Sequence, residues 1–336
     1  MSEPSQRAGL LAVKLGALVR DHAGDQTQHV PSAFGLGTAL MSGGEAWVLL
    51  DSDVDRGLGP AVAWALRHEA ARLNLVADRG TGALARRAES FRLPVTVWYS
   101  HERTLLRALA EPLAMPAQLD AAHEVFRSLI EAGGAVANVE HGVLVGEVEG
   151  LEVCRVVVDA ESGEARLEVG IGAHDRDAFQ LLHGVRPNVE ALAKVVNTVS
   201  EQRRPGTVGH PLNRLAAERA LRAHLVAHPE LIGATRVVPA QPPVERTNLK
   251  DAVPCVAVAS GPQGDTTVVC CVGVDLDVVP FATDARLVTQ VEQCVIVMPA
   301  RDVLPVQRAI TAALHTPIGI VPVDVVSVDA PAPITP

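Results

Sequence analysis

Aspartate residues gather at the ends of two apolar segments. In LLDSD, Asp51 and Asp53 follow a run of apolar residues, and in VGVDLD, Asp275 and Asp277 do the same. In open α/β sheets, ligands bind at the carboxyl ends of the strands, and carboxylate oxygens are the ligands that Mg²⁺ prefers. The sequence therefore predicts a metal site at these aspartates, with Mg²⁺ as the ion. The alternative is that they are polar strand ends and caps of the helices that follow.

Two glutamates form a second candidate site. Glu152 lies in GLEVCRVV and Glu168 lies in RLEVGIG, two segments that we expect to be neighbouring strands. Paired carboxylates can bind a metal that activates water, so Glu152 and Glu168 are the candidate catalytic residues. The alternative is that both face solvent from the exposed side of a half-buried sheet.

Other catalytic motifs are absent or incomplete. The chain holds no P-loop, no G-x-S-x-G and no zinc-binding spacing of cysteine and histidine. Gly57-Leu58-Gly59 lacks the third glycine of a dinucleotide-binding turn, and the aspartates beside it would repel a pyrophosphate. His174-Asp175 follows a predicted strand and could form an acid/base pair, although turn geometry accounts for it as well.

The cysteines and the net charge indicate the cellular compartment and the class of binding partner. The 5 cysteines lie in apolar segments and form no C-x-x-C, which predicts buried, reduced thiols in a cytoplasmic protein. The start, MSEPSQRAG, lacks the pattern of a signal peptide, and no apolar run approaches the roughly 18 residues of a membrane span. The net charge of -10 argues against broad, nonspecific binding of phosphates but leaves a local basic groove open.

Composition predicts the class of core. Apolar residues make up 48% of the chain and aromatic residues only 3%, so valine, alanine and leucine must fill the interior. Such an interior favours buried parallel strands covered by helices. The length of 336 residues predicts two or three domains.

Hydrophobic periodicity places the elements that would position these residues. The N-terminal part alternates strands and helices, with strands expected at 46–50, 73–77 and 94–99 and helices at 9–20, 60–72, 81–91 and 103–109. The middle part is expected to be α-β-β-β-α, with strands at 143–149, 151–158 and 165–171 between helices at 119–132 and 189–202. The C-terminal part follows a linker at 202–209, with helices expected at 212–227 and 301–315 and strands at 253–259, 267–274, 294–298 and 318–323.

Together these elements predict an α/β fold with N- and C-terminal, mostly parallel-sheet lobes that flank a mixed α/β middle unit. The expected domains are residues 1–117, 118–206 and 207–336. Both outer lobes run from an apolar strand through Asp-x-Asp to a helix and a further strand, which suggests a structural repeat.

The last lobe resembles the PD-(D/E)XK, restriction-endonuclease-like superfamily over about residues 212–325. Glu218 in LAAERALRAHL resembles the acid of the opening helix, and Asp251, before VPCVAVA, resembles the acid at the first site strand. The strand TVVCCVGV does not carry E-x-K, and Asp275 and Asp277 follow it instead. In that superfamily the acids hold the metal and the lysine positions or activates the attacking water. The resemblance therefore implies a nuclease-like fold with an incomplete site.

The middle unit offers an alternative core of the same kind, with Glu152 and Glu168, but its third strand reads Glu168-Val169-Gly170 and also lacks the lysine. The leading hypothesis is thus a non-catalytic or degenerate nuclease-like scaffold that binds a protein or a nucleic acid. The first alternative is a Mg²⁺-dependent hydrolase acting on a phosphoester. The second is a structural protein that assembles with itself.

Overall fold

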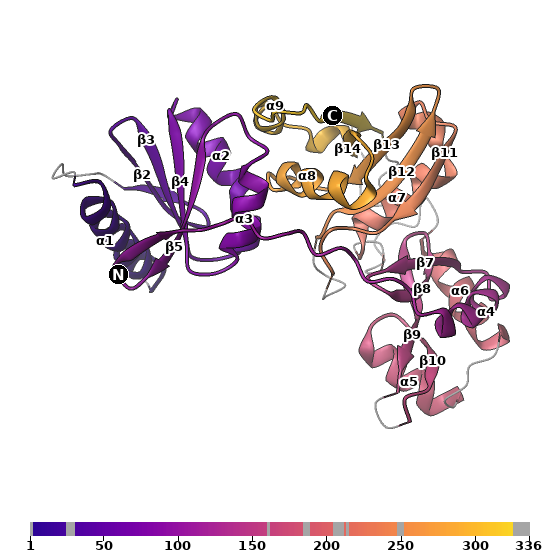
Figure 1. The fold of residues 1–336 in the computed structure, drawn as a ribbon. Helices are drawn as coiled ribbons and strands as arrows, with labels where there is room; N and C mark the ends of the chain where they lie inside the picture. Colours follow the sequence, from indigo (N-terminus) through magenta and orange to yellow (C-terminus); the bar gives the residue numbers. More distant parts are fainter. Residues whose placement is uncertain are drawn as a thin grey trace, which may run out of the picture. The chain divides into compact units, whose positions relative to one another are not determined.

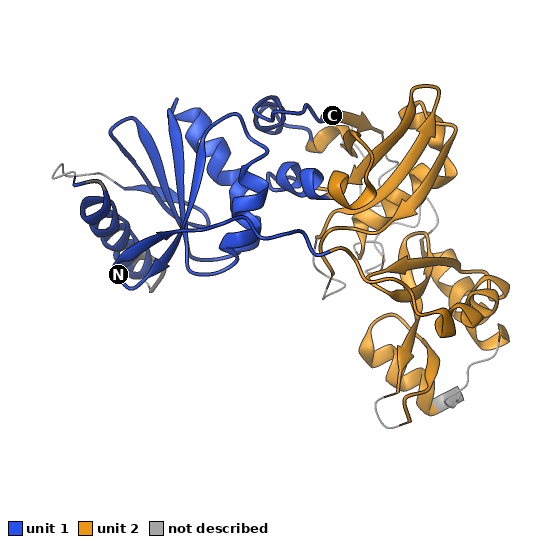
Figure 2. Ribbon diagram, in the orientation of Figure 1, with its two compact units in different colours: residues 1–114, 274–284, 303–319 blue, residues 115–273, 285–302, 320–336 orange. Residues whose placement is uncertain are grey.

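The structure is a computed structural model of the chain, and it describes residues 3–24, 31–159, 162–183, 189–203, 212, 215–246 and 252–324. Over these residues, three sheets alternate with helices along the chain (Figure 1), which confirms the predicted α/β class. The chain separates into two compact units (Figure 2). The first comprises residues 1–114, 274–284 and 303–319, and the second comprises residues 115–273, 285–302 and 320–336.

The first sheet has the strand order β1-β2-β3-β4-β5-β6. Its strands are β1 (Ser32–Phe34), β2 (Gly37–Ser42), β3 (Glu45–Leu50), β4 (Arg72–Ala77), β5 (Val95–His101) and β6 (Thr104–Arg107). The pairs β3–β4 and β4–β5 are parallel, whereas β1–β2, β2–β3 and β5–β6 are antiparallel. The sheet is therefore more antiparallel than we predicted.

Three helices cover the first sheet. Helix α1 (Glu3–Ala23) lies on one face, where Leu15, Leu18 and Val19 pack against Trp47 and other apolar side chains of β2 to β5. Helices α2 (Leu58–Arg67) and α3 (Thr81–Ala88) contact β4 and β5 and lie on the other side of the sheet (Figure 1). Burial on both faces explains why β3 reads from Ala46 to Leu50 as an unbroken apolar run.

The middle sheet is antiparallel with the order β10-β9-β8-β7. Its strands are β7 (Val136–Glu140), β8 (Val143–Val148), β9 (Leu151–Val158) and β10 (Ala165–Val169). They are preceded by a 3₁₀ helix at Ala121–Phe126 and by α4 (Arg127–Ala132), and are followed by α5 (Ala173–His183) and α6 (Val189–Gln202). Ile130 of α4 and Leu192 of α6 lie in the core on one face of this sheet. The predicted α-β-β-β-α order thus misses β7 and α5.

The third sheet has the order β11-β12-β13-β14-β15. Its elements are α7 (Ala217–Ala227), β11 (Arg236–Ala240), β12 (Cys255–Gly261), β13 (Gly264–Cys270), α8 (Val278–Thr289), β14 (Gln293–Pro299), α9 (Pro305–Ala312) and β15 (Gly319–Val323). The first three strands pair antiparallel, and β13 pairs parallel with β14.

The two outer parts of the chain repeat one order of elements: a helix, three strands paired antiparallel, a helix, a strand, a helix and a strand. In the first unit, equivalent segments just after α3 and α9 form a short antiparallel bridge between Phe91 and Leu314. Arg92 N donates to Ala313 O at 2.8 Å, and His315 N donates to Ser90 O at 2.9 Å. The shared order of elements is the observation that supports the predicted repeat.

One predicted helix was wrong. Residues 103–109 do not form a helix, because Thr104–Arg107 pairs with β5 as strand β6. A two-residue turn connects the strands, and Glu102 adopts the positive φ of 51° that such turns require. Several elements were also missed, and two of them, α8 and β11, contain a proline that weakens the local signal.

Candidate functional site

The aspartates after β3 do not share one strand face. Asp51 accepts a hydrogen bond from Arg7 Nε of α1 at 2.8 Å. At Asp53 the backbone turns into the left-handed region, with φ 42°, and starts a 3₁₀ turn at Val54–Arg56. The strand therefore ends before the alternation that would align the two carboxylates can continue.

The aspartates that follow β13 lie within the first unit and are held there by hydrogen bonds. Asp275 Oδ2 accepts from Arg56 Nη2 at 2.7 Å, and its Oδ1 accepts from Asp277 N at 2.9 Å. Asp277 is only 3% exposed, and its Oδ1 accepts from Gly59 N in the first turn of α2 at 2.9 Å. Asp277 thus satisfies one of the free N–H groups at the start of α2, as a capping residue does.

Gly59 makes this contact possible. A Cβ atom at position 59 would lie 2.1 Å from Leu276 O, so only glycine allows the segment that carries Asp277 to approach the helix so closely. The glycine therefore has a packing role.

A buried cluster of charges extends from Asp277. We call Arg86, Arg87, Asp277 and Asp284 the Arg87 cluster. Arg87 Nη1 lies 3.4 Å from Asp277 Oδ2, and Arg87 Nε donates to Asp284 Oδ2 at 2.6 Å. Arg86 donates to both carboxylate oxygens of Asp284, which is 1% exposed. The carboxylates at this position thus bind guanidinium groups.

The Arg87 cluster predicts a pH dependence of stability. Burial raises the pKa of Asp277 from 3.8 to about 7, although Arg87 and the Gly59 N–H lower it. Because the folded-state pKa is the higher one, the stability linked to protonated Asp277 is fully present below its ordinary pKa and is lost as the pH rises through about 7. In Asp277→Asn, which keeps the acceptor for Gly59, we expect the free energy of unfolding to fall less between pH 5 and 8.

The measurement for Asp277 is urea denaturation of both proteins across that pH range. The 3 tryptophans are Trp47, Trp64 and Trp98, and all belong to the first unit, so tryptophan fluorescence reports its unfolding. Equal pH slopes for the two proteins would contradict the prediction.

Glu152 and Glu168 lie on neighbouring strands, as predicted. Glu168 of β10 pairs in register with Arg155 of β9, while Glu152 pairs with Glu147 of β8. Arg176 of α5 joins them, with Nη1 3.7 Å from Glu152 and Nε 3.3 Å from Glu168. The structure therefore brings the two side chains together through an arginine.

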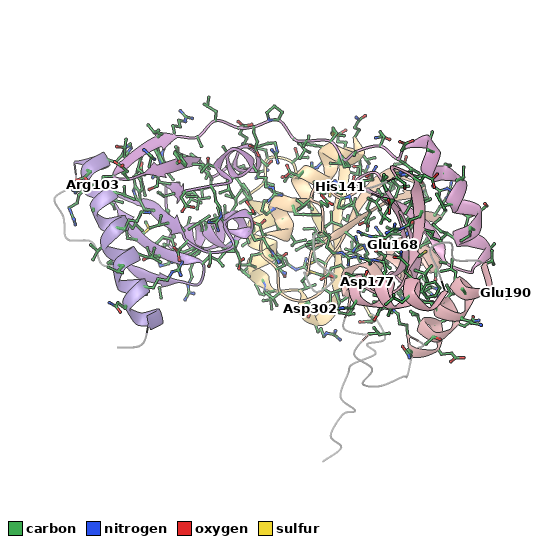
Figure 3. All side chains as sticks on the ribbon, turned by 90° about the horizontal axis from the view of Figure 1, so that it is seen from below. Arg103, His141, Glu168, Asp177, Glu190 and Asp302 are labelled. Atoms are coloured by element: carbon green, nitrogen blue, oxygen red, sulfur yellow. The ribbon has the colours of Figure 1, made fainter. Side chains whose placement is uncertain are left out.

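Further arginines complete the neutralisation of this glutamate pair. Arg155 donates to both oxygens of Glu152, at 2.7 and 3.2 Å, and Arg246 Nη2 lies 3.8 Å from it. Arg166 donates to Glu168 at 2.9 Å. Glu152 is only 5% exposed, so it does not face solvent, while Glu168 (Figure 3) is partly exposed.

A second buried cluster in the second unit was not predicted. We call Glu140, Glu147, Arg219 and Arg222 the Arg222 cluster. Arg222 of α7 is 1% exposed and donates to both oxygens of Glu147 at 3.0 Å and to Glu140 at 3.1 Å. Arg219 donates to Glu140, and Asn138 donates to Glu147 at 2.7 Å. One helix turn thus supplies both arginines, since residues three apart share a face.

The electrostatics of this cluster follow from its burial. Burial raises the pKa of Glu147 even though Arg222 lowers it. Burial would also raise the pKa of Glu140, but Arg219 and Arg222 together bring it below its ordinary value. The only sequence signal was the placement of Arg219 and Arg222 beside the apolar residues of α7, Leu221 and Leu225, which an arginine-rich composition explains equally well.

No metal centre is visible in the part of the chain that the structure describes, where no group of three or more His, Cys, Asp or Glu side chains could hold an ion. All five cysteines lie within the described residues, where they are buried and form no disulfide, as predicted. Burial raises the pKa of Cys154 and of Cys294 to about 12, which removes the thiolate that a nucleophile needs.

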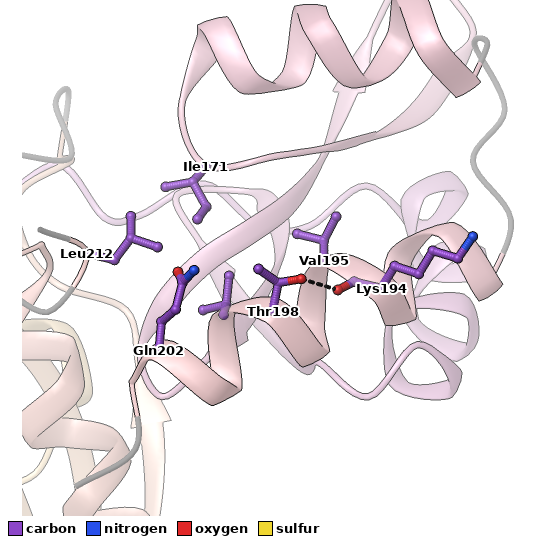
Figure 4. A pocket seen from close by; sticks show the side chains of 7 residues that line it. Ile171, Lys194, Val195, Thr198, Gln202 and Leu212 are labelled. Atoms are coloured by element: carbon purple, nitrogen blue, oxygen red, sulfur yellow. Dashed lines mark hydrogen bonds between the residues drawn. The ribbon is translucent and has the colours of Figure 1, made fainter. Parts of the chain in front are cut away.

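An apolar groove lies beside α6 in the second unit (Figure 4). Its volume is about 230 Å³, and its lining is Ile171, Lys194, Val195, Thr198, Val199, Gln202 and Leu212. In Figure 4 the ammonium group of Lys194 points away from Ile171 and Leu212. The groove is below the roughly 300 Å³ at which small-molecule sites begin, and none of the predicted acids lines it.

Among the described residues, none of the helices is both long and apolar enough to cross a membrane. No family model, curated protein or solved structure matches the chain.

Proposed function

We propose that this protein is a non-catalytic scaffold that binds another protein. The observation that carries the proposal is the pairing of the candidate acids. Five of the six (Asp51, Asp275, Asp277, Glu152 and Glu168) accept hydrogen bonds from, or form ion pairs with, arginine side chains. A carboxylate that binds a metal or activates water needs free lone pairs, and each of these five carboxylates already binds a guanidinium group with at least one oxygen.

A protein is favoured over a nucleic acid because the same pairing removes positive charge from the surface. Arg87, Arg219 and Arg222 are buried on acids of the fold, and Arg86 and Arg176 are largely so. Phosphate binding requires exposed basic side chains, whereas this chain has a net charge of -10. These five arginines therefore stabilise the fold and are not available to bind phosphates.

A degenerate nuclease-like origin for the C-terminal part belongs to the same proposal. The order α7, β11 to β13, α8, β14, α9 and β15 supports it, because it has the opening helix, the strands and the helix–strand–helix–strand ending of that superfamily. The site is incomplete: β13 carries no E-x-K, Glu218 is only 6% exposed, and Asp251 lies outside the described residues. This supports a scaffold in which the catalytic lysine has no equivalent.

The hydrolase alternative is tested with Mg²⁺ itself. We expect calorimetric titration of the whole chain with MgCl₂ to give no binding heat, and a chromogenic phosphodiester to show no turnover above the rate without protein. The matched variant is Asp275→Asn, which releases Arg56 but should change neither result. Mg²⁺-dependent turnover that is lost in Asp275→Asn or Glu168→Gln would overturn the proposal in favour of a hydrolase.

The nucleic-acid alternative is tested by fluorescence anisotropy with labelled single-stranded and double-stranded oligonucleotides at low salt. We expect no binding, because the net charge of -10 opposes the approach of phosphates and Arg87, Arg219 and Arg222 are buried on acids of the fold. Binding that weakens steeply as salt is added would contradict the choice of a protein partner. Concentration-dependent light scattering by the pure chain would instead support the self-assembling alternative.

A further inference from the structure

Strand β6 has a free edge in the part of the sheet that the structure describes. It is the last strand of the first sheet and pairs only with β5. The two-residue turn and the hydrogen bond from Ala108 N to Val97 O, at 2.8 Å, determine which residues of β6 bond to β5 through their backbone. Thr104 and Leu106 therefore direct their N–H and C=O groups at β5, whereas those of Leu105 and Arg107 point outward.

The edges of the third sheet contrast with this one. Its terminal strands, β11 and β15, each contain a proline, Pro239 and Pro322. Proline on an edge strand removes a donor and is a common way to prevent pairing with another chain. No proline interrupts β6, so its outward N–H and C=O groups can bond a further strand.

The two faces of the β6 edge differ in chemistry. On one face, Tyr99 and its cross-strand neighbour Leu106 are exposed to 37% and 52%, and Tyr99 stacks on His101. On the other face, Leu105 packs into the core beneath α1, and Arg107 beside it is exposed. One face is thus an apolar, aromatic strip, and the other presents a cation.

A second arginine lies at the end of the same edge. Arg103 in the β5–β6 turn is 80% exposed at its side chain, although it lies 3.3 Å from Asp21 of α1 (Figure 3). A strand that pairs with β6 would pass Arg107 and approach Arg103. Since Arg103 is paired with Asp21, Arg107 is the cation of β6 that is complementary to an acidic side chain of a partner. The strip at Tyr99 and Leu106 is complementary to apolar side chains.

We propose that the β6 edge binds an extended segment of a partner protein that alternates apolar and acidic residues. The segment adds a strand to the first sheet, with backbone hydrogen bonds to Leu105 and Arg107. Its apolar side chains cover Tyr99 and Leu106, and its acidic side chains meet Arg107. This inference names the site and partner chemistry of the proposed scaffold function and rests on it.

The probe is a short labelled peptide that alternates valine and glutamate, and the control probe alternates valine and lysine. We expect the whole chain to bind the glutamate peptide, measured by fluorescence anisotropy, and to bind the lysine peptide at least about tenfold more weakly. On binding, hydrogen exchange at the amides of Leu105 and Arg107 should slow. The amides of Thr104 and Leu106, which already bond to β5, should change little.

Arg107→Pro is the decisive variant, because it removes both an outward N–H and the guanidinium group without removing a bond to β5. We expect it to weaken peptide binding at least about tenfold while leaving the melting temperature unchanged, since no intramolecular hydrogen bond is lost. Arg107→Glu should reverse the preference to the lysine peptide. Arg79→Glu, at another exposed arginine of the same unit, is the matched control and should bind as the unaltered chain does.

The outcomes separate this inference from the proposed function. If the glutamate peptide fails to bind, or binds equally well to Arg107→Pro, the β6 site is wrong, while a scaffold that binds elsewhere stands. If Arg107→Pro abolishes self-association of the pure chain, the occupant is a second copy, and the acidic partner segment is wrong. Mg²⁺-dependent turnover would overturn the function itself, whatever the peptide does.

Discussion

Replacing Arg222 with methionine is expected to lower the free energy of unfolding of the second unit by about 3–5 kcal/mol. The guanidinium group donates to both oxygens of Glu147 and to Glu140, and its side chain is 2% exposed. Methionine fills similar space but leaves Glu147 buried, with its nearest remaining cation, Arg219 Nε, at 3.5 Å. Removing one partner of a buried ion pair lowers stability by far more than the intact pair contributes, because the other charge remains buried without water to solvate it.

The cysteines allow the second unit to be followed alone. All 5 belong to it and are buried, so the rate at which a thiol reagent labels them in urea reports the unfolding of that unit. Tryptophan fluorescence, which reports the first unit, should show an unchanged transition in Arg222→Met. A loss below about 1 kcal/mol at the thiols would contradict the prediction, since that is the value of an exposed pair.

A double variant separates the unpaired charge from the altered packing. In Arg222→Met with Glu147→Gln, the glutamate charge is gone, and the amide oxygen of the new side chain can still accept from Asn138. We expect the double variant to recover a large part of the stability lost in Arg222→Met, because apolar replacement of a buried pair is often nearly neutral. No recovery would mean that packing around residue 222 causes the loss.

The local pattern of the sequence predicts the positions of the candidate acids well. Asp51 comes directly after β3, and Glu152 and Glu168 lie on adjacent strands, but β13 ends at Cys270, short of Asp275. These features depend on periodicity over a few residues, which the sequence displays directly. The α/β class follows from the same signals.

The partners of those acids were not predictable in the same way. Arg56 and Asp275 are separated by 219 positions, and Arg222 and Glu147 by 75. Which arginine meets which acid depends on how distant elements pack, and periodicity carries no information on that. The sequence around an acid at a strand end is the same whether a metal or a guanidinium group binds the acid. Only the contacts with distant arginines distinguish the two.

The missed strand β6 has a physical explanation as well. Residues 103–109 contain two arginines and three leucines, which are good helix formers, so their intrinsic propensity favours a helix. Pairing with β5 and burial of Leu105 beneath α1 override that propensity. The same override produces the exposed edge on which the partner-binding proposal depends.

Asp284→Asn is expected to have the corresponding effect on the first unit, with a loss of about 3–5 kcal/mol in its free energy of unfolding. Asp284 is 1% exposed and accepts hydrogen bonds from both Arg86 and Arg87. Asparagine has the same shape but no charge, so Arg87, which is 6% exposed, loses its shorter ion pair. It is left 3.4 Å from Asp277, whose pKa of about 7 makes it a weaker counter-charge near neutral pH. Two guanidinium groups then lie close together without the anion that separated their charges.

Tryptophan fluorescence in urea measures this loss, and the thiol-labelling transition of the second unit serves as the internal reference. The matched control is Asp78→Asn, which breaks an exposed Asp–Arg pair of the same unit, 3.6 Å apart and about 60% exposed at both side chains. Solvent screens that pair, so its loss should cost no more than about 1 kcal/mol. If Asp284→Asn and Asp78→Asn lose equal free energy of unfolding, burial does not strengthen the ion pairs of the Arg87 cluster, and the prediction is wrong.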